Sequence, residues 1–307
     1  MTEPGASAPA AVVMVRPHHF FVNQDTALDN AFQSDHAHDP AAIAESAYAE
    51  TTALADALRA RGVTVHLFDD VREDRPDAIF PNNWLSTHED GRIAVYPMRS
   101  PQRRGERRAD IIQELQEQYR VTGLVDYSEL ERENVFLEGT GSLVLDHAER
   151  VAYVARSPRA DDSAVLRFCA DFGYEPFIFD AVDATGTPIY HTNVMMTIAT
   201  EYALVVPDVI PDAGRRGELL DRLAASGHPV IELTRTQLHE FAGNAIELTG
   251  SAGRVLALST RARDSLTPEQ LGIIEASSDI VAVPVPTAEL AGGSVRCMIA
   301  GVHLPRR

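Results

Sequence analysis

Residues 191–206 read HTNVMMTIATEYALVV, in which a short polar sequence is followed by an apolar run, a polar turn near Thr200 and a second apolar run. This order is typical of a β-hairpin. Three other segments have the same order: FPNNWLSTHEDGRIAVY at 80–96, EGTGSLVLDHAERVAYV at 138–154 and GNAIELTGSAGRVLAL at 243–258. Asn193 follows Ser142 by 51 residues, and Asn244 follows Asn193 by the same 51 residues. The spacing therefore indicates an internal repeat built on hairpins.

The repeat alternates with helical segments and continues toward the end of the chain. One more step of about 50 residues reaches residues 293–297. Capping residues mark the starts of helices at Asp39, Asp212 and Thr267. A period of this length predicts a stacked or radial array, and about 300 residues accommodate about five units. We therefore expect an α/β fold, a ring of about five ββαβ-type modules in which the polar sequence before each hairpin lies at the central axis.

Composition excludes several classes of protein. The 307-residue chain has a net charge of −18, and its 27 basic residues are all arginine. Nucleic-acid binding needs a basic face, and a Schiff-base or P-loop enzyme needs lysine. No apolar run of about 18 residues is present, so we expect no membrane span. We expect residues 1–11 to be a disordered lead-in without signal-peptide features, residues 12–307 to form a single catalytic domain, and the protein to be cytoplasmic.

Cys297 is the candidate nucleophile. It follows Gly292-Gly293, where a sulfur atom can lie close to backbone and substrate, whereas Cys169 lies in a helical pattern and is expected in the core. His191 can carry the proton that thiol chemistry needs, and Glu138 can orient that histidine. Because the repeat places all three near the axis, we predict that they form one catalytic set.

These motifs resemble those of the guanidine-modifying superfamily, which includes arginine deiminases, dimethylarginine hydrolases and amidinotransferases. Its members share the pentein fold, a five-bladed β/α-propeller with pseudo-five-fold symmetry. The resemblance extends from Val12 to His303. The strings FPNNW at 80–84 and YHTN at 190–193 look closest to the branch called citrulline utilization hydrolases, or arginine deiminase-related proteins. The resemblance implies a pentein domain for this chain.

The resemblance also implies covalent catalysis. As a thiolate, Cys297 would attack the central carbon of a guanidino or ureido group, and His191 would protonate the leaving amine and then activate water. Glu138 would hold His191 and favour its charged form, which in turn favours the thiolate. No cofactor is required, and the histidines between residues 18 and 38 lack the further ligands of a metal site.

Three residues depart from the arginine-acting relatives. Asn83 and Asn193 stand where those relatives use aspartates to bind a guanidinium, and Gly141 stands where deiminases have the aspartate of an E-G-G-D motif. Two carboxylates suit a buried cation, whereas an asparagine amide offers donors and an acceptor without charge. The amides therefore favour a neutral ureido group, and the leading reaction is hydrolysis of citrulline to ornithine, carbon dioxide and ammonia. Turn capping is an alternative role for both asparagines.

Arginines are the expected ligands of the substrate α-carboxylate, because a guanidinium binds a carboxylate in a bidentate fork. Arg159 is the first candidate, since residues 157–159 (SPR) resemble the S-x-R motif of the family. The second candidate is Arg103 or Arg104, in the basic run that precedes Glu106.

Several alternatives stay open at this point. The chain could be an arginine or substituted-arginine deiminase or dihydrolase, an amidinotransferase, or a non-catalytic member that binds amino acids. In every case the partner is a small-molecule amino acid, and a homo-oligomer is left open. Residues 17–40 are polar and rich in turn formers, and we put forward a lid over the axis as their role.

Overall fold

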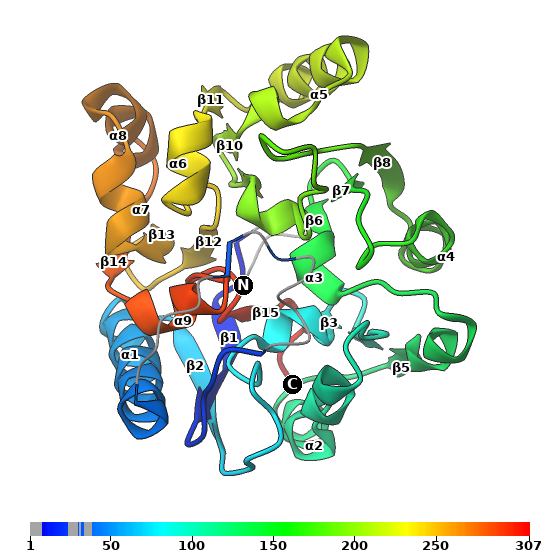
Figure 1. Ribbon diagram of the computed structural model, residues 1–307, viewed down its shortest axis with the longest axis vertical. Helices are drawn as coiled ribbons and strands as arrows, with labels where there is room; N and C mark the ends of the chain where they lie inside the picture. The colour runs from blue at the N-terminus through cyan, green and yellow to red at the C-terminus, as the bar shows by residue number, and fades with distance from the viewer. Residues whose placement is uncertain (1–7, 24–29, 31, 34–38) are drawn as a thin grey trace.

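The computed structural model describes residues 8–23, 30, 32–33 and 39–307. Figure 1 shows its strands arranged around a common centre, with most helices outside them. Within the described residues the strands form five sheets of three strands each. The sheets are β15–β1–β2 (Ala300–Val302, Ala11–Pro17, Thr64–Asp70), β3–β4–β5 (Leu85–Thr87, Arg92–Val95, Gly123–Asp126), β6–β7–β8 (Val144–Asp146, Val151–Ala155, Glu175–Phe179), β9–β10–β11 (Met196–Ile198, Ala203–Val205, Val230–Glu232) and β12–β13–β14 (Ile246–Thr249, Arg254–Ser259, Asp279–Val283).

Every sheet combines an antiparallel pair with a third strand that runs parallel to the middle one. In one of them, Leu204 of β10 pairs with Thr197 of β9 on one side and with Ile231 of β11 on the other. The four hairpins expected from the turn sequences are confirmed, as is the short strand expected after each helix. The five sheets are compatible with a pseudo-five-fold repeat.

The fifth sheet joins the two ends of the chain. β1 pairs antiparallel with β15 and parallel with β2, so Val12 lies opposite Gly301 and Val65. The unit that the repeat spacing predicted near residues 293–297 therefore takes its middle strand from the N-terminal end. Thr249 donates hydrogen bonds to the carbonyl oxygens at positions 8 and 9, at 2.7 and 3.0 Å. Residues 8–11 of the expected lead-in are thus part of the fold, and residues 1–7 lie outside the described residues.

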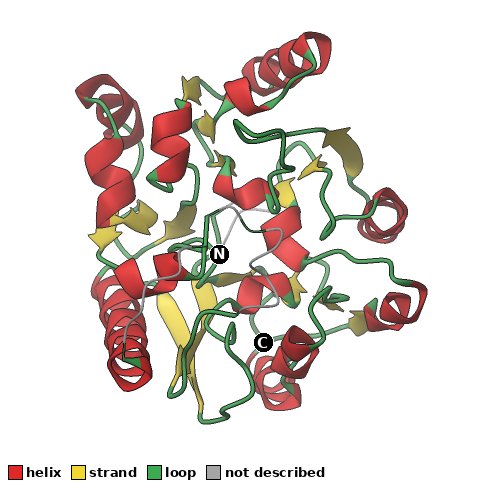
Figure 2. Cartoon of the chain, in the orientation of Figure 1, coloured by secondary structure: helices red, strands yellow, loops and turns green. Residues whose placement is uncertain are grey.

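Most of the longer helices lie at the periphery, outside the sheets (Figure 2). The α-helices are α1 (Pro40–Ala60), α2 (Ala109–Gln118), α3 (Gly139–Ser142), α4 (Asp162–Phe172), α5 (Ala213–Ala225), α6 (Arg235–His239), α7 (Thr260–Ser265), α8 (Pro268–Glu275) and α9 (Pro286–Leu290). Short 3-10 helices are η2 (Pro81–Asn83), η3 (Gln102–Glu106), η4 (Ser128–Glu133), η5 (Thr192–Val194) and η6 (Pro207–Val209). Asp39, Asp212 and Thr267 cap α1, α5 and α8 as predicted, because each side chain accepts a hydrogen bond from a first-turn amide.

Apolar side chains fill the space between the sheets and the helices. Every residue of β7 is buried, and Cys169 of α4 is buried in the same cluster, as its helical pattern predicted. None of the helices in the described part of the chain is long and apolar enough to cross a membrane.

Short helical turns precede the first strands of the hairpins, and turns from successive repeats contact one another. Thr192 Oγ1 donates to the carbonyl oxygen of Ser142 at 2.6 Å, and Asn244 Nδ2 donates to the carbonyl oxygen of Asn193 at 3.0 Å. These are the repeat positions, 50 and 51 residues apart. The predicted convergence of the polar sequences is therefore confirmed for these units, and it brings distant residues to one place.

Candidate active site

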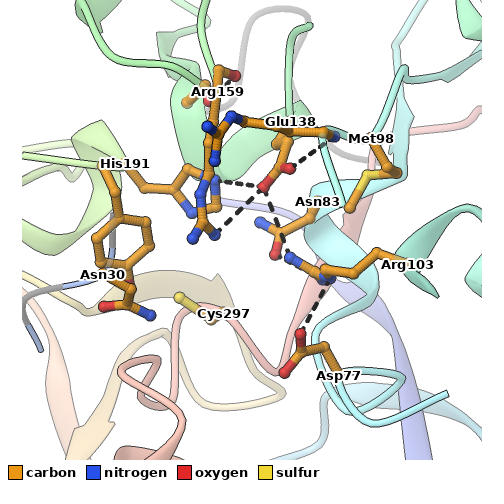
Figure 3. A network of polar contacts seen from close by, with 12 residues as sticks. Asn30, Asp77, Asn83, Met98, Arg103, Glu138, Arg159, His191 and Cys297 are labelled. Atoms are coloured by element: carbon orange, nitrogen blue, oxygen red, sulfur yellow. Dashed lines mark hydrogen bonds and ion pairs between the residues drawn. The ribbon is translucent and has the colours of Figure 1, made fainter. Parts of the chain in front are cut away.

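A buried pocket lies where these polar turns meet. Together with the open solvent at its mouth it has a volume of about 280 Å³, and its described lining consists of Asn30, Asp77, Phe80, Asn83, Arg103, Arg159, Tyr190, His191, Ala291, Gly293 and Cys297. The lining includes five candidate site residues named from the sequence: Cys297, His191, Asn83, Arg159 and Arg103. Glu138 is bonded to His191, with Oε2 2.9 Å from Nε2. Figure 3 shows the polar network around the pocket, with the Cys297 sulfur below the side chains of His191 and Arg159 in this view.

Glycines allow Cys297 to reach the pocket wall. Gly292 has φ 81°, in the left-handed region that favours glycine. A Cβ atom on Gly293 would lie 2.8 Å from the Phe80 ring and 3.2 Å from the Cβ of Cys297, so a larger residue would displace the nucleophile. The amide of Cys297 donates to the carbonyl oxygen of Ser294 at 2.9 Å and closes the turn.

Two asparagine amides donate to the sulfur of Cys297. Asn193 Nδ2 lies 3.4 Å and Asn244 Nδ2 lies 3.3 Å from Sγ. Asn193 was predicted to bind substrate, but its amide contacts the nucleophile and the residue is not part of the described pocket lining. Asn244 also accepts a hydrogen bond from the amide of Arg296 at 3.1 Å, which holds it beside the cysteine turn. N–H donors favour a thiolate over a thiol, because they stabilise the negative charge.

Glu138 is buried but ionised. Burial opposes its charge, yet Arg159, His191 and Arg103 together hold the pKa of Glu138 well below its usual range. Both guanidinium groups approach Oε2, at 3.6 Å for Arg159 and 3.5 Å for Arg103. The amide of Arg99 donates to Oε1 at 3.1 Å. The carboxylate therefore serves as a fixed acceptor for the Nε2–H of His191.

His191 is neutral at pH 7, in contrast to the imidazolium that the sequence led us to expect. Burial lowers the pKa of His191 to about 4, and the hydrogen bond and charge of Glu138 offset this only in part. Arg159 and Arg103 add to the lowering. The physical reason is burial, which opposes charge on the imidazole more strongly than Glu138 favours it. A neutral imidazole whose Nε2–H donates to Glu138 leaves Nδ1 as a proton acceptor.

The two neighbouring arginines of the basic run point to different places. Arg103 lines the pocket, and its Nη2 donates to Asn83 Oδ1 at 3.0 Å while its fork binds Glu106. Arg104, predicted as a substrate ligand, is outside the described lining; its Nε donates to the carbonyl oxygen of Met98 and lies 3.3 Å from Glu131. Of the two candidate arginines, only Arg103 therefore lines the described pocket, because the η3 turn directs only one of the two side chains inward.

Asn83 presents a donor to the pocket. Its Oδ1 is occupied by Arg103, and its buried Nδ2 has no partner among the described residues. A Cβ atom on Gly141 would lie 2.3 Å from this Nδ2 and 2.7 Å from His191 Nδ1. The glycine that departs from the E-G-G-D motif is thus required sterically, since any side chain would separate these two groups.

Several residues at the site were missed by the sequence argument. Asp77 accepts a hydrogen bond from Asn23 at 2.9 Å and lies 3.5 Å from Arg103, but it precedes the first hairpin and has no repeat signal. Asn30 lines the pocket from the segment predicted as a lid, of which residues 24–29, 31 and 34–38 lie outside the described residues. Of these missed residues, Asn244 could have been found from the sequence, because it occupies the repeat position of Asn193.

No group of three or more His, Cys, Asp or Glu side chains within the described ranges has the geometry of a metal site. The polar atoms around Cys297 are instead amides, guanidinium groups and carboxylates bonded to one another. The arrangement is suited to nucleophilic attack by a thiolate, with an imidazole as proton carrier.

Comparisons with known proteins agree with this geometry. A family model described as N,N dimethylarginine dimethylhydrolase, eukaryotic, matches residues 16–304, and no curated protein matches the sequence. The N-terminal domain of ArgZ, a cyanobacterial arginine dihydrolase, is 16% identical with a TM-score of 0.75, over 96% of this chain and 98% of that one. AgrE bound to L-arginine is 17% identical with a TM-score of 0.74, over 97% of this chain and 40% of that one.

The dimethylarginine hydrolase DDAH of Pseudomonas aeruginosa, complexed with citrulline, is 15% identical with a TM-score of 0.63, over 95% of this chain and 99% of that one. At such identities the structural likeness shows a shared α/β fold. The match to the family model, in contrast, spans most of the sequence and includes every residue of the pocket lining.

Proposed function

The chain belongs to the N,N dimethylarginine dimethylhydrolase family, hydrolases of guanidino C–N bonds, and we propose that Cys297, His191 and Glu138 are its catalytic residues. The observation that carries this proposal is that the Cys297 sulfur and His191 line one buried pocket while Glu138 holds the imidazole at 2.9 Å. The imidazole contacts Glu138 through Nε2, which leaves Nδ1 for proton transfer, and the Cys297 sulfur accepts hydrogen bonds from two amides.

The proposed substrate is L-citrulline. Asn83 Nδ2, a buried donor without a partner in the described structure, would bind the ureido oxygen. Arg159, on the pocket wall, would bind the α-carboxylate. The carboxylates of Asp77, Glu106 and Glu138 already lie against the guanidinium groups of Arg103 and Arg159, which suits an amino acid with a neutral side chain.

The proposed reaction proceeds through a covalent intermediate. His191 Nδ1 takes the proton of the Cys297 thiol as the sulfur adds to the ureido carbon. Nδ1 then passes this proton to the terminal nitrogen, and ammonia leaves, which gives an S-thiocarbamate. His191 then takes a proton from water, the hydroxide adds to the same carbon, and the C–S bond breaks. The resulting N-carbamate of ornithine loses carbon dioxide. The two amides on Sγ would stabilise the sulfur as attacking and as leaving group.

Asp77 supports L-arginine as a second candidate substrate. The argument for a neutral ureido group rested on two asparagines, but Asn193 contacts the sulfur and Asp77 supplies a carboxylate in the lining. A carboxylate beside the reacting group would stabilise a guanidinium. Hydrolysis at both terminal nitrogens would convert arginine to ornithine with citrulline as the intermediate. ArgZ is described as an arginine dihydrolase.

We extend the proposal to the whole chain. The pairing of β1 with β15 supports closure of the five units into a pentein propeller, with residues 12–307 as one catalytic domain. A thiol nucleophile is kept reduced in the cytoplasm, which supports the predicted location. A homo-oligomer remains open.

Product analysis by mass spectrometry tests the function. The protein is incubated separately with citrulline, arginine and N,N-dimethylarginine, with Cys297→Ala as the inactive variant and Cys169→Ala as the matched control. Ornithine from citrulline, absent only with Cys297→Ala, supports the first candidate, and ornithine from both citrulline and arginine supports the second. Citrulline that accumulates from either guanidino compound overturns the citrulline assignment but keeps the catalytic residues. No product from any of the three refutes the proposed function.

A further inference from the structure

A second cavity lies on the other side of the cysteine turn. It is partly open and has a volume of about 660 Å³ when the open solvent at its mouth is counted. In the described structure it is lined by one strand from each of the five sheets, β3, β6, β9, β12 and β15. We call it the axial cavity. Arg296 lines the axial cavity and Cys297 lines the catalytic pocket, so two consecutive residues face different spaces. The turn that carries the nucleophile therefore separates the two cavities.

Arg296 places a positive charge deep in the axial cavity. Its Nη1 donates to the carbonyl oxygen of Ile299 at 3.0 Å, and within the described residues no carboxylate forms an ion pair with it. Burial lowers the pKa of Arg296 to about 10, and the neighbouring Cys297 opposes this lowering. A half-buried guanidinium without a carboxylate partner among the described residues is an arrangement that an external anion would stabilise.

Two histidines of the axial cavity provide further donors. His147 and His303 stack with ring centroids 4.1 Å apart, and both line the cavity. Burial lowers the pKa of each, to about 4 for His303, and Arg296 lowers both further. The rings are therefore neutral at pH 7, and each keeps one N–H. His147 Nδ1 is bonded to the hydroxyl of Tyr174 at 3.0 Å, which leaves Nε2 for another partner.

Glu247 supplies the carboxylate among the described residues that line the axial cavity, and its oxygens bind other residues. Glu247 accepts hydrogen bonds from the amide and hydroxyl of Thr200 at 2.7 and 2.6 Å, and from the hydroxyl of Ser278 at 2.7 Å. It therefore does not neutralise Arg296. The cavity thus combines a half-buried cation, two half-buried imidazole rings and open volume, which are the elements of an oxyanion site.

We propose that the axial cavity binds a small oxyanion, a phosphate or a short carboxylate, between Arg296 and the rings of His147 and His303, and that this anion lowers the reactivity of Cys297. An anion that pairs with Arg296 removes positive potential from the far side of the cysteine turn. The thiolate is then less favoured, and attack by sulfur slows. The effect would be a control of the enzyme by anion concentration, at a site distinct from the substrate pocket.

Binding is measured first, by calorimetric titration of the whole protein with phosphate and, separately, with acetate at constant ionic strength. The variants are His303→Gln and His147→Gln, which lie outside the catalytic pocket, and Arg159→Gln, which removes one of the guanidinium groups that line that pocket. We expect saturable binding of at least one anion that is weakened about tenfold or more in both histidine variants and retained in Arg159→Gln. The phosphate and acetate arms identify which oxyanion the cavity accepts. Thermal unfolding of each variant verifies that it is folded.

The rate of Cys297 alkylation by iodoacetamide, followed by mass spectrometry, is the second readout and needs no turnover. We expect saturating anion to slow it about threefold or more in the wild type and to leave it unchanged in the histidine variants. The inference would be overturned if neither phosphate nor acetate showed saturable binding, or if anion binding were lost in Arg159→Gln but kept in the histidine variants. It would also be overturned if a bulky sulfonate slowed the alkylation of Cys297 as much as the small anion does. Because alkylation and calorimetry do not depend on citrulline or arginine hydrolysis, failure here is separate from failure of the proposed function.

Discussion

Replacement of Gly141 by alanine is expected to disable the site while leaving the protein folded. The added Cβ atom would lie 2.3 Å from Asn83 Nδ2 and 2.7 Å from His191 Nδ1, where ordinary contact begins at 3.4 Å. The polar groups must therefore move by about 1 Å, and a displacement of that size at reacting groups costs on the order of 100-fold in rate. Overpacking of a buried site costs roughly 1–3 kcal/mol of stability.

The assay compares kcat/KM for ornithine formation with the free energy of unfolding in urea. Gly217→Ala is the matched control, because a Cβ atom there meets nothing within 4 Å in helix α5. Alanine in a helix interior is favoured over glycine by about 1 kcal/mol, so the control should gain stability and keep full activity. If Gly141→Ala stays folded and retains kcat/KM within about threefold, the account of how Asn83 and His191 are held together is wrong.

Three further predictions concern the nucleophile, the base and the carboxylate ligand. Asn244→Ala removes one of two donors to Sγ and should slow alkylation of Cys297 about tenfold; an unchanged rate would show that this amide does not support the thiolate. Because the pKa of His191 falls from about 6.5 in the unfolded chain to about 4 when folded, its neutral form stabilises the protein above pH about 6.5. This stability should be lost as the pH falls toward 4, with a smaller loss in His191→Gln, as urea unfolding at each pH will test. Arg159→Gln should raise the KM for the amino acid about 100-fold, whereas Arg104→Gln, outside the pocket lining, should leave KM within about twofold; equal effects would contradict the assigned carboxylate site.

Much of the fold could be predicted because its signals are local. Hairpin turns and helix caps depend on a few adjacent residues, so the hairpin around Thr200 and the caps at Asp39, Asp212 and Thr267 were recognisable in the sequence. The fifth sheet was predicted less completely, because β1 and β15 lie at opposite ends of the chain and share no turn. Their pairing is a long-range contact that no local pattern encodes.

The site residues that belong to the hairpin repeat could be predicted, and those outside the repeat were missed. Equal spacing in the sequence becomes proximity when repeats surround one axis, so Glu138, His191 and Cys297 could be grouped before their positions were known; their roles remain predictions. Asp77 and Asn30 reach the pocket from segments outside the repeat. Nothing in the sequence around Asp77 and Asn30 indicates that these residues line the pocket.

By itself, the sequence determined the residue types available for the chemistry, the hairpin repeat and the convergence of its polar turns. Only the tertiary structure decided that Arg103 rather than Arg104 enters the pocket. It also decided that Asn193 contacts the Cys297 sulfur and does not belong to the described pocket lining. It also decided that His191 is neutral, since burial outweighs Glu138. The physical reason is common to all three. Side-chain direction, desolvation and competition for hydrogen-bond partners depend on neighbours that are distant in the chain, and only the packed molecule brings those neighbours together.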